Sequence, residues 1–296
     1  MIKTLAILTP TYNRAKLLKR LYNSLLNQTQ MDFVWYVIDD GSTDDTNLVI
    51  SEFINNKNKF EIFYKQKQNG GKHSAINEGL KFIEEPLTLI VDSDDFLQTD
   101  AVERIVLDYK QIKDKQDICG LGYLKEETNG KIVGKPYTKD GVADTFVNQR
   151  YNKNTFGDKC EVFKTEILKQ YPFPEFEGEN FVSEATVWCK MSGPYKMIFF
   201  NRSIYVCEYQ PDGLTASSHK RLFNNPQGAV ECYKQLTTKQ FRFKLRCKYT
   251  IAYIAYSLSA QKTKKQIIEE SINKTLTRVL FFAGKCYYKR LRNSNK

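Results

Sequence analysis

The stretch Leu89-Ile90-Val91-Asp92-Ser93-Asp94-Asp95 joins an apolar run to three carboxylates within four residues. A short continuous apolar run is typical of a strand buried on both faces, so we expect a strand that ends at Asp92. Carboxylates this close together repel one another, and a divalent cation would relieve the repulsion. The stretch therefore suggests a metal site. The competing interpretation is an acidic turn in which Asp95 or Thr99 caps a helix over residues 100–113.

Three earlier apolar runs show the same organisation, each followed by a polar loop and a helical pattern. The expected strands cover residues 5–8, 33–38 and 60–64. Four successive strand and helix units predict an α/β fold with a mostly parallel sheet and helices on both faces, because parallel neighbours need crossover connections. Ligands bind such sheets at the carboxyl ends of the strands. The loops expected there are residues 9–12, 39–42, 69–72 and 92–95.

The first of these loops lacks the glycine patterns of dinucleotide-binding and P-loop proteins, so a nucleotide would have to be held in another way. Asp39 and Asp40 could accept hydrogen bonds from a base N–H or from ribose hydroxyls. Tyr12 offers a ring for stacking, with packing in the core as the competing interpretation.

Past residue 116 the pattern changes to strands, with one short amphipathic helix within residues 181–188 for which Ser183 is a possible cap. The expected strands are 118–125, 157–163, 195–201 and 204–208, with a hairpin turn at Asn129-Gly130 that returns through Ile132 and Val133. From Pro226 onward the pattern is helical. We therefore expect a mixed region after the parallel sheet and a helical extension at the C-terminal end.

Composition fits a globular enzyme of 296 residues with 41% hydrophobic content. Seven cysteines without paired spacing indicate a reducing compartment. No run reaches the ~18 apolar residues that a membrane-spanning helix needs, and the N-terminal residues lead into a strand rather than a secretory signal. These features predict a cytoplasmic protein.

The net charge of +11 is concentrated near the C-terminal end. From Lys239 onward the chain has fifteen lysines and arginines against Glu269 and Glu270, whereas residues 1–238 carry 30 basic and 32 acidic side chains. Basic helices with interleaved aromatic residues suit an anionic membrane surface, which would make the protein peripheral on the inner face of the cell membrane. Nucleic acid is the competing partner, but no nucleic-acid-binding module is recognisable. A helical cap with a solvated outer face is the third interpretation.

Four motifs in this order resemble those of the family 2 glycosyltransferases of the GT-A type, over residues 5–213. They are Pro10-Thr11-Tyr12-Asn13-Arg14, Asp39-Asp40-Gly41-Ser42-Thr43-Asp44, Asn69-Gly70-Gly71 and Asp92-Ser93-Asp94. The resemblance implies a GT-A fold and a nucleotide diphosphate sugar as donor, most often a UDP-sugar. It also implies a manganese or magnesium ion on the donor's diphosphate.

The resemblance also implies roles for individual residues at the strand ends. Asp40 would bind the base with Asp39 nearby, and Pro10, Thr11 and Tyr12 would line the base and ribose pocket. Asp94 would be the direct metal ligand, with Asp92 on the ribose or the ion's waters and Ser93 between them in the donor site. Lys72 and His73 are candidates for contacting phosphate or base, with a solvated loop as the alternative.

Family 2 enzymes invert the anomeric carbon, which requires a carboxylate base for the acceptor hydroxyl. Glu184 is our candidate, although Ser183-Glu184-Ala185 departs from the family's usual Glu-Asp pair. A capping or dipole-stabilising role at a helix start is the alternative for Glu184, with Asp95 or Asp158 as the base. His219 fits a metal ligand by its position in the family, and a solvated surface histidine otherwise.

We therefore expect a catalytic domain over residues 1–215, with a nucleotide-binding half (1–115) and an acceptor half (116–215). A basic, aromatic-rich helical region follows over residues 216–296. The expected function is an inverting, metal-dependent hexosyltransferase acting on a saccharide or lipid-linked acceptor in cell-surface polysaccharide or glycolipid synthesis. The alternatives are a sugar nucleotidyltransferase and an inactive protein that only binds sugar nucleotides.

Overall fold

The computed structural model describes residues 2–208 and 218–294, apart from the side chains of Ser218 and His219. The chain folds into two compact units. The first comprises Met1–Pro172 and Pro194–Gln210, and the second comprises Phe173–Gly193 and Pro211–Lys296. Segment 173–193, expected in the catalytic domain, thus groups with the C-terminal helices. The domain boundary at residue 215 remains a prediction.

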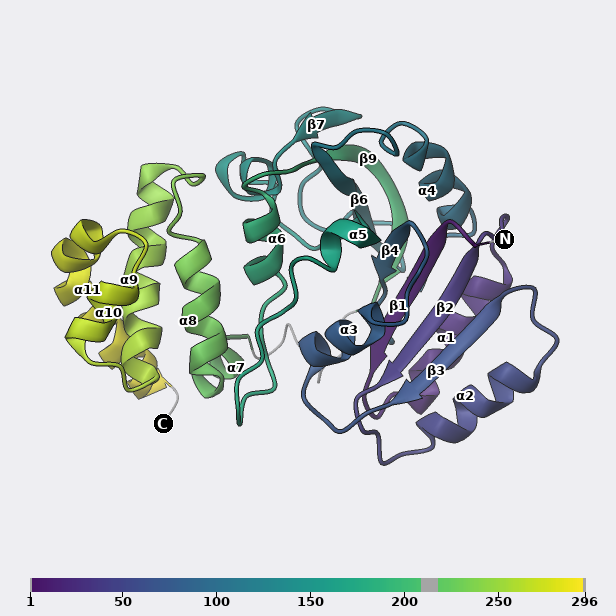
Figure 1. The fold of residues 1–296 in the computed structure, drawn as a ribbon, viewed down its shortest axis with the longest axis horizontal. Coiled ribbons are helices and arrows are strands. Elements are labelled where there is room, and N and C mark those ends of the chain that lie inside the picture. Colours follow the sequence, from purple (N-terminus) through teal and green to yellow (C-terminus); the bar gives the residue numbers. More distant parts are fainter. Residues whose placement is uncertain (1, 209–217, 295–296) are drawn as a thin grey trace. The chain divides into compact units, whose positions relative to one another are not determined.

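The first unit is built on a sheet that has nine strands among the described residues, in the order β3-β2-β1-β4-β8-β6-β9-β5, with β7 paired to β9 (Figure 1). Its parallel half consists of β1 (Leu5–Thr11), β2 (Phe33–Asp39), β3 (Glu61–Gln66) and β4 (Leu87–Ile90). Every residue of β1 and β2 is buried, as the continuous apolar runs predict. The four expected strands are therefore confirmed.

Helices cover both faces of this parallel half, which confirms the α/β prediction. On one face, α1 (Ala15–Leu26) and α2 (Thr46–Asn55) place Tyr22 and Phe53 in a stack that reaches Trp35 of β2. On the other face lies α3 (Lys72–Leu80). A Cβ added at Gly79 of α3 would lie 2.4 Å from Leu8 Cδ1, so glycine allows this helix to approach β1 closely.

The other half of the sheet is mixed. It contains β5 (Phe96–Leu97), β6 (Ile118–Glu127), β7 (Val142–Asp144), β8 (Lys159–Lys164) and β9 (Lys196–Cys207). Strand β8 is antiparallel to β4 and β6, whereas β9 is parallel to β6 and antiparallel to β5 and β7. Helices α4 (Ala101–Tyr109) and α5 (Thr165–Leu168) and a π-helical turn, η1 (Asn148–Asn152), complete this unit.

Two local predictions in this half are wrong and one is confirmed. Residues 195–201 and 204–208 form the single strand β9, because irregularities in its pairing with β6 absorb the polar residues between them. The hairpin at Asn129-Gly130 is confirmed, because Ile132 forms an antiparallel bridge with Glu126 and the Val133 N–H donates to the Lys125 carbonyl. Helix α4 begins after Asp100 without a side-chain cap and ends at Tyr109, so neither Asp95 nor Thr99 caps it.

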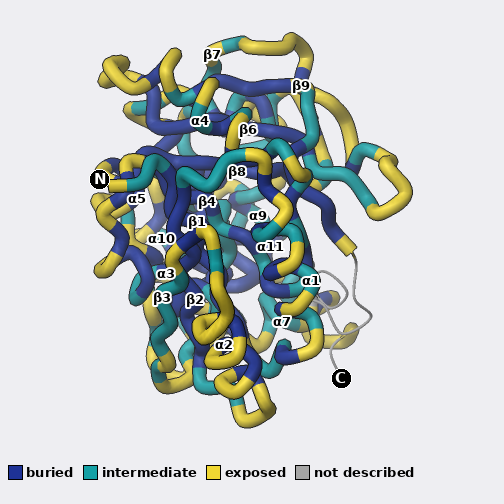
Figure 2. Tube along the Cα trace, turned by 90° about the vertical axis from the view of Figure 1, so that its right-hand side faces the viewer, coloured by how far each residue is buried: buried dark blue, intermediate teal, exposed yellow. Residues whose placement is uncertain are grey.

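The second unit is helical, which confirms the pattern expected from Pro226 onward. Its helices are α6 (Ala185–Met191), α7 (Ser218–Asn224), α8 (Pro226–Gln235), α9 (Phe243–Ser259), α10 (Lys264–Glu270) and α11 (Lys274–Ser294). Tyr253, Ile254 and Tyr256 of α9 form the centre of its core. Gly284 lets α11 pack against α9, since an added Cβ would lie 2.5 Å from Ile254 Cβ. In Figure 2, by comparison, strands β6 and β9 of the first unit are mostly dark blue, the colour of buried residues. Among the described residues, no helix combines the length and apolar character that crossing a bilayer requires.

Reciprocal hydrogen bonds join the segment before α6 to the start of α8. Asn225 Oδ1 accepts from the backbone N–H groups of Asn180 and Phe181, at 2.8 and 3.1 Å. In return the Glu179 carboxylate accepts from the N–H groups of Gln227 and Gly228, which begin α8. An added Cβ at Gly228 would lie 2.5 Å from the Phe181 carbonyl oxygen. This junction fixes where the chain enters α6.

We predict that Asn225→Ala lowers the free energy of unfolding by about 1–3 kcal/mol. The backbone N–H groups of Asn180 and Phe181 would lose their acceptor, and Asn225 is buried. Asn225→Asp keeps an acceptor oxygen and should recover a large part of the loss. Asn224→Ala, one residue away, is the matched control. Urea unfolding followed by circular dichroism measures all three, and equal midpoints for Asn225→Ala and the wild type would contradict the role of the junction.

Candidate functional site

The polar loops that follow the parallel strands meet at one edge of the sheet in the first unit. Asp40 N–H donates to the Thr11 carbonyl, and Asn13 N–H donates to Ser42 Oγ, so the loops after β1 and β2 are joined. Lys72 Nζ lies 2.5 Å from Asp92 Oδ1, which joins the loop after β3 to the loop after β4. We call this edge the strand-end site.

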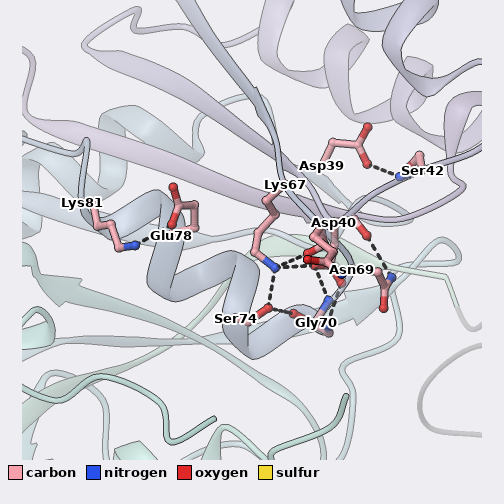
Figure 3. A network of polar contacts seen from close by, with 11 residues as sticks. Asp39, Asp40, Ser42, Lys67, Asn69, Gly70, Ser74, Glu78 and Lys81 are labelled. Atoms are coloured by element: carbon pink, nitrogen blue, oxygen red, sulfur yellow. Dashed lines mark hydrogen bonds and ion pairs between the residues drawn. The ribbon is translucent and has the colours of Figure 1, made fainter. Parts of the chain in front are cut away.

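Asp40 anchors the loop that leads into α3 (Figure 3). Its carboxylate accepts from Lys67 Nζ at 2.9 Å and from the N–H groups of Gly70 and Gly71 at 2.9 and 2.6 Å. A carboxylate has about four acceptor positions, so these donors leave about one. Gly71 has φ +90°, a backbone conformation that glycine adopts without strain. Asp40 thus holds the loop, and the residue itself is 3% exposed.

Asp39 is more enclosed than Asp40. Its carboxylate accepts from Ser42 N–H at 2.8 Å, Tyr64 OH at 2.9 Å and Gln66 Nε2 at 3.3 Å, and the residue is fully buried. Burial and the contact with Asp39 raise the pKa of Tyr64, so its hydroxyl stays a donor. Asp39 supports the loop after β2 and is out of reach of solvent.

The loop after β1 presents one buried hydroxyl and one exposed ring. Thr11 is 3% exposed, and its Oγ1 has no hydrogen-bond partner among the described residues. Burying a hydroxyl oxygen without a hydrogen-bond partner costs free energy unless a ligand or a water supplies the missing bond. Tyr12 is 46% exposed, so the interpretation of Tyr12 as core packing is wrong. Pro10 is buried within β1.

At the end of β4 the carboxylates alternate between the outside and the inside. Asp92 and Asp94 are partly exposed, whereas Ser93 and Asp95 are buried. Burial acts to raise the pKa of Asp92, but Lys72 and Lys125 outweigh it and hold the pKa below its ordinary value. Burial and the neighbouring Asp92 charge raise the pKa of Asp94. The two outward carboxylates thus keep the mutual repulsion that the sequence indicates.

Asp95 faces into the protein. Its Oδ1 accepts from Glu208 N–H at 3.1 Å, and its Oδ2 lies 3.9 Å from Lys125 Nζ. Burial raises the pKa of Asp95 to about 6, against the attraction of Lys125. Lys125 itself lies over the Tyr205 ring, 3.8 Å from its centroid. Asp95 therefore connects β4 with β9 beneath the strand-end site.

Three basic residues of this site were missed by sequence reasoning. Lys67 holds Asp40, and Lys125 lies under the carboxylates. Arg20 of α1 donates to the Asp94 carbonyl oxygen and pairs with Glu208, with its guanidinium 5.0 Å from the Phe96 ring centroid. Only Lys67 gives a signal in the sequence, as a cation two residues before the Asn69-Gly70-Gly71 motif.

The residues present fit a divalent metal that is shared with a ligand. Asp92 and Asp94 offer carboxylate oxygens, which Mg²⁺ and Mn²⁺ prefer. No group of three or more His, Cys, Asp or Glu side chains able to hold a metal occurs in the part of the chain that the structure describes. Mg²⁺ is commonly held by one or two carboxylates plus substrate phosphates and water, and this donor set matches that pattern.

Glu184 lies in the second unit. It occupies the N-cap position of α6, is partly buried, and makes no side-chain cap hydrogen bond. The prediction that Ser183 caps the helix is therefore wrong, and the Ser183 side chain bonds with Cys232 instead. Asp158, an alternative base, is exposed in the first unit. The side chain of His219 lies outside the described residues.

Two further surfaces lie in the second unit. A polar hollow of about 420 Å³ is lined by Gly178, Asn180, Lys220, Arg221, Asn224 and Asn225. On α11, Val279 and Phe282 are 72% and 78% exposed. The basic residues exposed on the same helix are Lys274, Arg278, Lys285, Lys289, Arg290 and Arg292. We call this exposed side of α11 the basic apolar face.

Comparison with known proteins identifies the family of the chain. The family described as "Glycosyl transferase family 2" matches residues 6–171, more than half of the chain. A Campylobacter jejuni relative, GalNAc(5)-diNAcBac-PP-undecaprenol beta-1,3-glucosyltransferase, is 24% identical over 273 residues, which are 89% of this chain and 85% of that protein.

Solved structures share the fold. S. aureus TarS 1-349 in complex with UDP-GlcNAc gives a TM-score of 0.63 at 18% identity, covering 98% of this chain and 91% of that one. Mannosyltransferase PcManGT from Pyrobaculum calidifontis, in complex with GDP-Man and Mn2+, gives a TM-score of 0.57 at 17% identity, covering 100% and 84%. The expected GT-A fold is confirmed by this similarity. From the sequence match and the fold together, the chain belongs to glycosyl transferase family 2 and is a glycosyltransferase.

Proposed function

We propose that the protein is an inverting, metal-dependent glycosyltransferase that moves a sugar from a UDP-sugar to a saccharide or lipid-linked acceptor. The observation that carries the proposal is the strand-end site, where Asp92 and Asp94 face outward beside the loops held by Asp40. The TarS structure in complex with UDP-GlcNAc and the undecaprenol-linked acceptor named for the Campylobacter relative support this choice of substrates.

The base and ribose of the donor would bind over the ends of β1 and β2. Asp40 has about one acceptor position left, which suits the imino N–H of a uracil ring. The buried Thr11 hydroxyl would gain the partner that it lacks in the described residues. Tyr12 exposes a ring that can stack on a base, while Asp39 supports this pocket from beneath.

The donor's diphosphate would lie at the end of β4. A Mn²⁺ or Mg²⁺ ion bound there would neutralise charge on the departing nucleoside diphosphate. Asp94 would hold the ion directly, and Asp92 would hold it or one of its waters. Arg20 donates to the Asp94 carbonyl oxygen and so holds the Asp94 backbone in place. The Asp94 carboxylate would then bind the ion without a prior ordering of this loop.

Glu184 would take the proton from the acceptor hydroxyl. Asp95 is a poor candidate for the base, because it is buried and bonded to the Glu208 amide. Glu184 is partly exposed and does not cap α6, and the junction of residues 179–181 with α8 fixes the backbone before it. A carboxylate that is held in position and open to solvent suits general base catalysis.

The basic apolar face of α11 would bring the enzyme to an anionic membrane and so to a lipid-linked acceptor. Each Lys or Arg near such a surface is worth about 1 kcal/mol, and an exposed aromatic ring adds apolar burial at the interface. Phe282 lies among six exposed basic residues, which is the arrangement such binding needs.

The first prediction concerns the metal. UDP should raise the melting temperature more with Mn²⁺ than without it, because a ligand that binds the folded state stabilises it. Asp94→Ala should remove that Mn²⁺-dependent increment, whereas Asp114→Ala, an exposed carboxylate elsewhere, should keep it. Differential scanning fluorimetry measures the shifts. A full increment in Asp94→Ala would disprove the assignment of Asp94.

The second prediction concerns the base. Glu184→Gln should lower kcat by about 10²- to 10⁴-fold, because the amide cannot accept the acceptor's proton. UDP affinity should stay unchanged, which isothermal titration calorimetry can verify. With the wild-type enzyme, product analysis should show UDP and no pyrophosphate, because a sugar nucleotidyltransferase would release pyrophosphate instead. If Glu184→Gln kept the wild-type turnover rate, another residue would have to be the base.

The third prediction concerns the membrane. At low salt the 296-residue protein should float with vesicles containing an anionic lipid and remain behind with neutral vesicles. Phe282→Ser should weaken flotation, and the matched control Phe156→Ser, an exposed ring in the first unit, should not. If the wild-type protein fails to float with anionic vesicles, the membrane role is refuted.

A further inference from the structure

Lys72 places a positive charge beside Asp92, one of the two carboxylates proposed to hold the metal. Its ammonium group is 2.5 Å from Asp92 Oδ1, and both side chains are partly exposed, at 24% and 32%. The pair is therefore formed at the surface of the strand-end site and not deep in the core. A cation bound to Asp92 would have to share that carboxylate with Lys72, and like charges at such a distance repel each other.

Other basic groups add to this compensation. Lys125 attracts Asp92 and Asp95 from beneath, and Arg14 and Lys72 both act on Asp94. Arg20 donates to the Asp94 carbonyl oxygen. The three carboxylates at the end of β4 are thus surrounded by cationic side chains of the protein itself. A divalent cation arriving alone therefore gains less from Asp92, whose charge Lys72 and Lys125 already compensate.

Neither loop anchoring nor helix stability explains the position of Lys72. Lys67 is the residue that anchors the loop before α3, through Asp40, the Gln68 carbonyl and Ser74. Lys72 is the first residue of α3, and a cation at a helix N-terminus is unfavourable with the helix dipole. The contact with Asp92 helps to offset this cost.

We propose that Lys72 acts as a built-in counter-ion that makes metal binding depend on the donor. In the free protein it neutralises Asp92 and disfavours a lone divalent cation. A nucleotide diphosphate brings negative charge that satisfies both the metal and the Lys72 ammonium, so the cation and the nucleotide bind together. This inference rests on the proposed function of the strand-end site and assigns to Lys72 a positioning and selectivity role within it.

The test measures Mn²⁺ binding without nucleotide, by the electron paramagnetic resonance signal of free Mn²⁺ at fixed ionic strength. Lys72→Met should bind Mn²⁺ about tenfold or more tightly than the wild type, because one like charge is removed beside Asp92. Lys72→Arg keeps the charge and should resemble the wild type. Lys65→Met, which removes a lysine paired with Glu78 away from the site, is the matched control.

A second measurement repeats the titration at saturating UDP. In the wild type UDP should strengthen Mn²⁺ binding by a factor that is about tenfold larger than in Lys72→Met, and the reverse coupling must be equal by linkage. Equal Mn²⁺ affinities for wild type and Lys72→Met without nucleotide, with both proteins folded by circular dichroism, would overturn the proposal. If UDP with Mn²⁺ does not bind to the wild type at all, the proposed function itself fails, which is a different outcome.

Discussion

Crowded negative charge at the end of β4 is the constraint on which the strand-end site depends. Asp92 and Asp94 stay outward, Asp95 turns inward, and Arg14, Lys72 and Lys125 from other parts of the chain partly compensate their charge. Without that compensation, three carboxylates within four residues would disfavour the folded state. The same carboxylates can bind a metal ion that in turn binds a diphosphate, so one arrangement of charge would serve both stability and function.

The parallel half of the sheet explains why these groups meet. Its strands run in one direction, so the loops after β1, β2, β3 and β4 all leave at the same edge. Hydrogen bonds across the edge then tie the loops to one another, with Asp40 holding Gly70 and Gly71 at the start of α3. The buried strands supply rigidity, and the loops supply the polar groups that face a ligand.

Much of this arrangement follows from the sequence. Continuous apolar runs predict β1, β2 and β4, and the carboxylates after β2 and β4 indicate a ligand site by their type and spacing. The cationic partners are not predictable in the same way. Arg20 meets the Asp94 carbonyl 74 residues away, and Lys67 meets Asp40 at a separation of 27 residues, so only tertiary structure brings each pair together. The course of β9 is mispredicted because polar residues in its middle resemble a turn, whereas pairing with β6 keeps it continuous.

The most direct measurement of the central claim is a crystal structure of the protein with UDP and Mn²⁺, with anomalous diffraction recorded at the manganese edge. The account predicts a single anomalous peak at the end of β4, coordinated by the Asp94 carboxylate and by oxygens of the UDP diphosphate. An ordered UDP whose ion lies away from Asp94, or a nucleotide bound at another edge of the sheet, would contradict it.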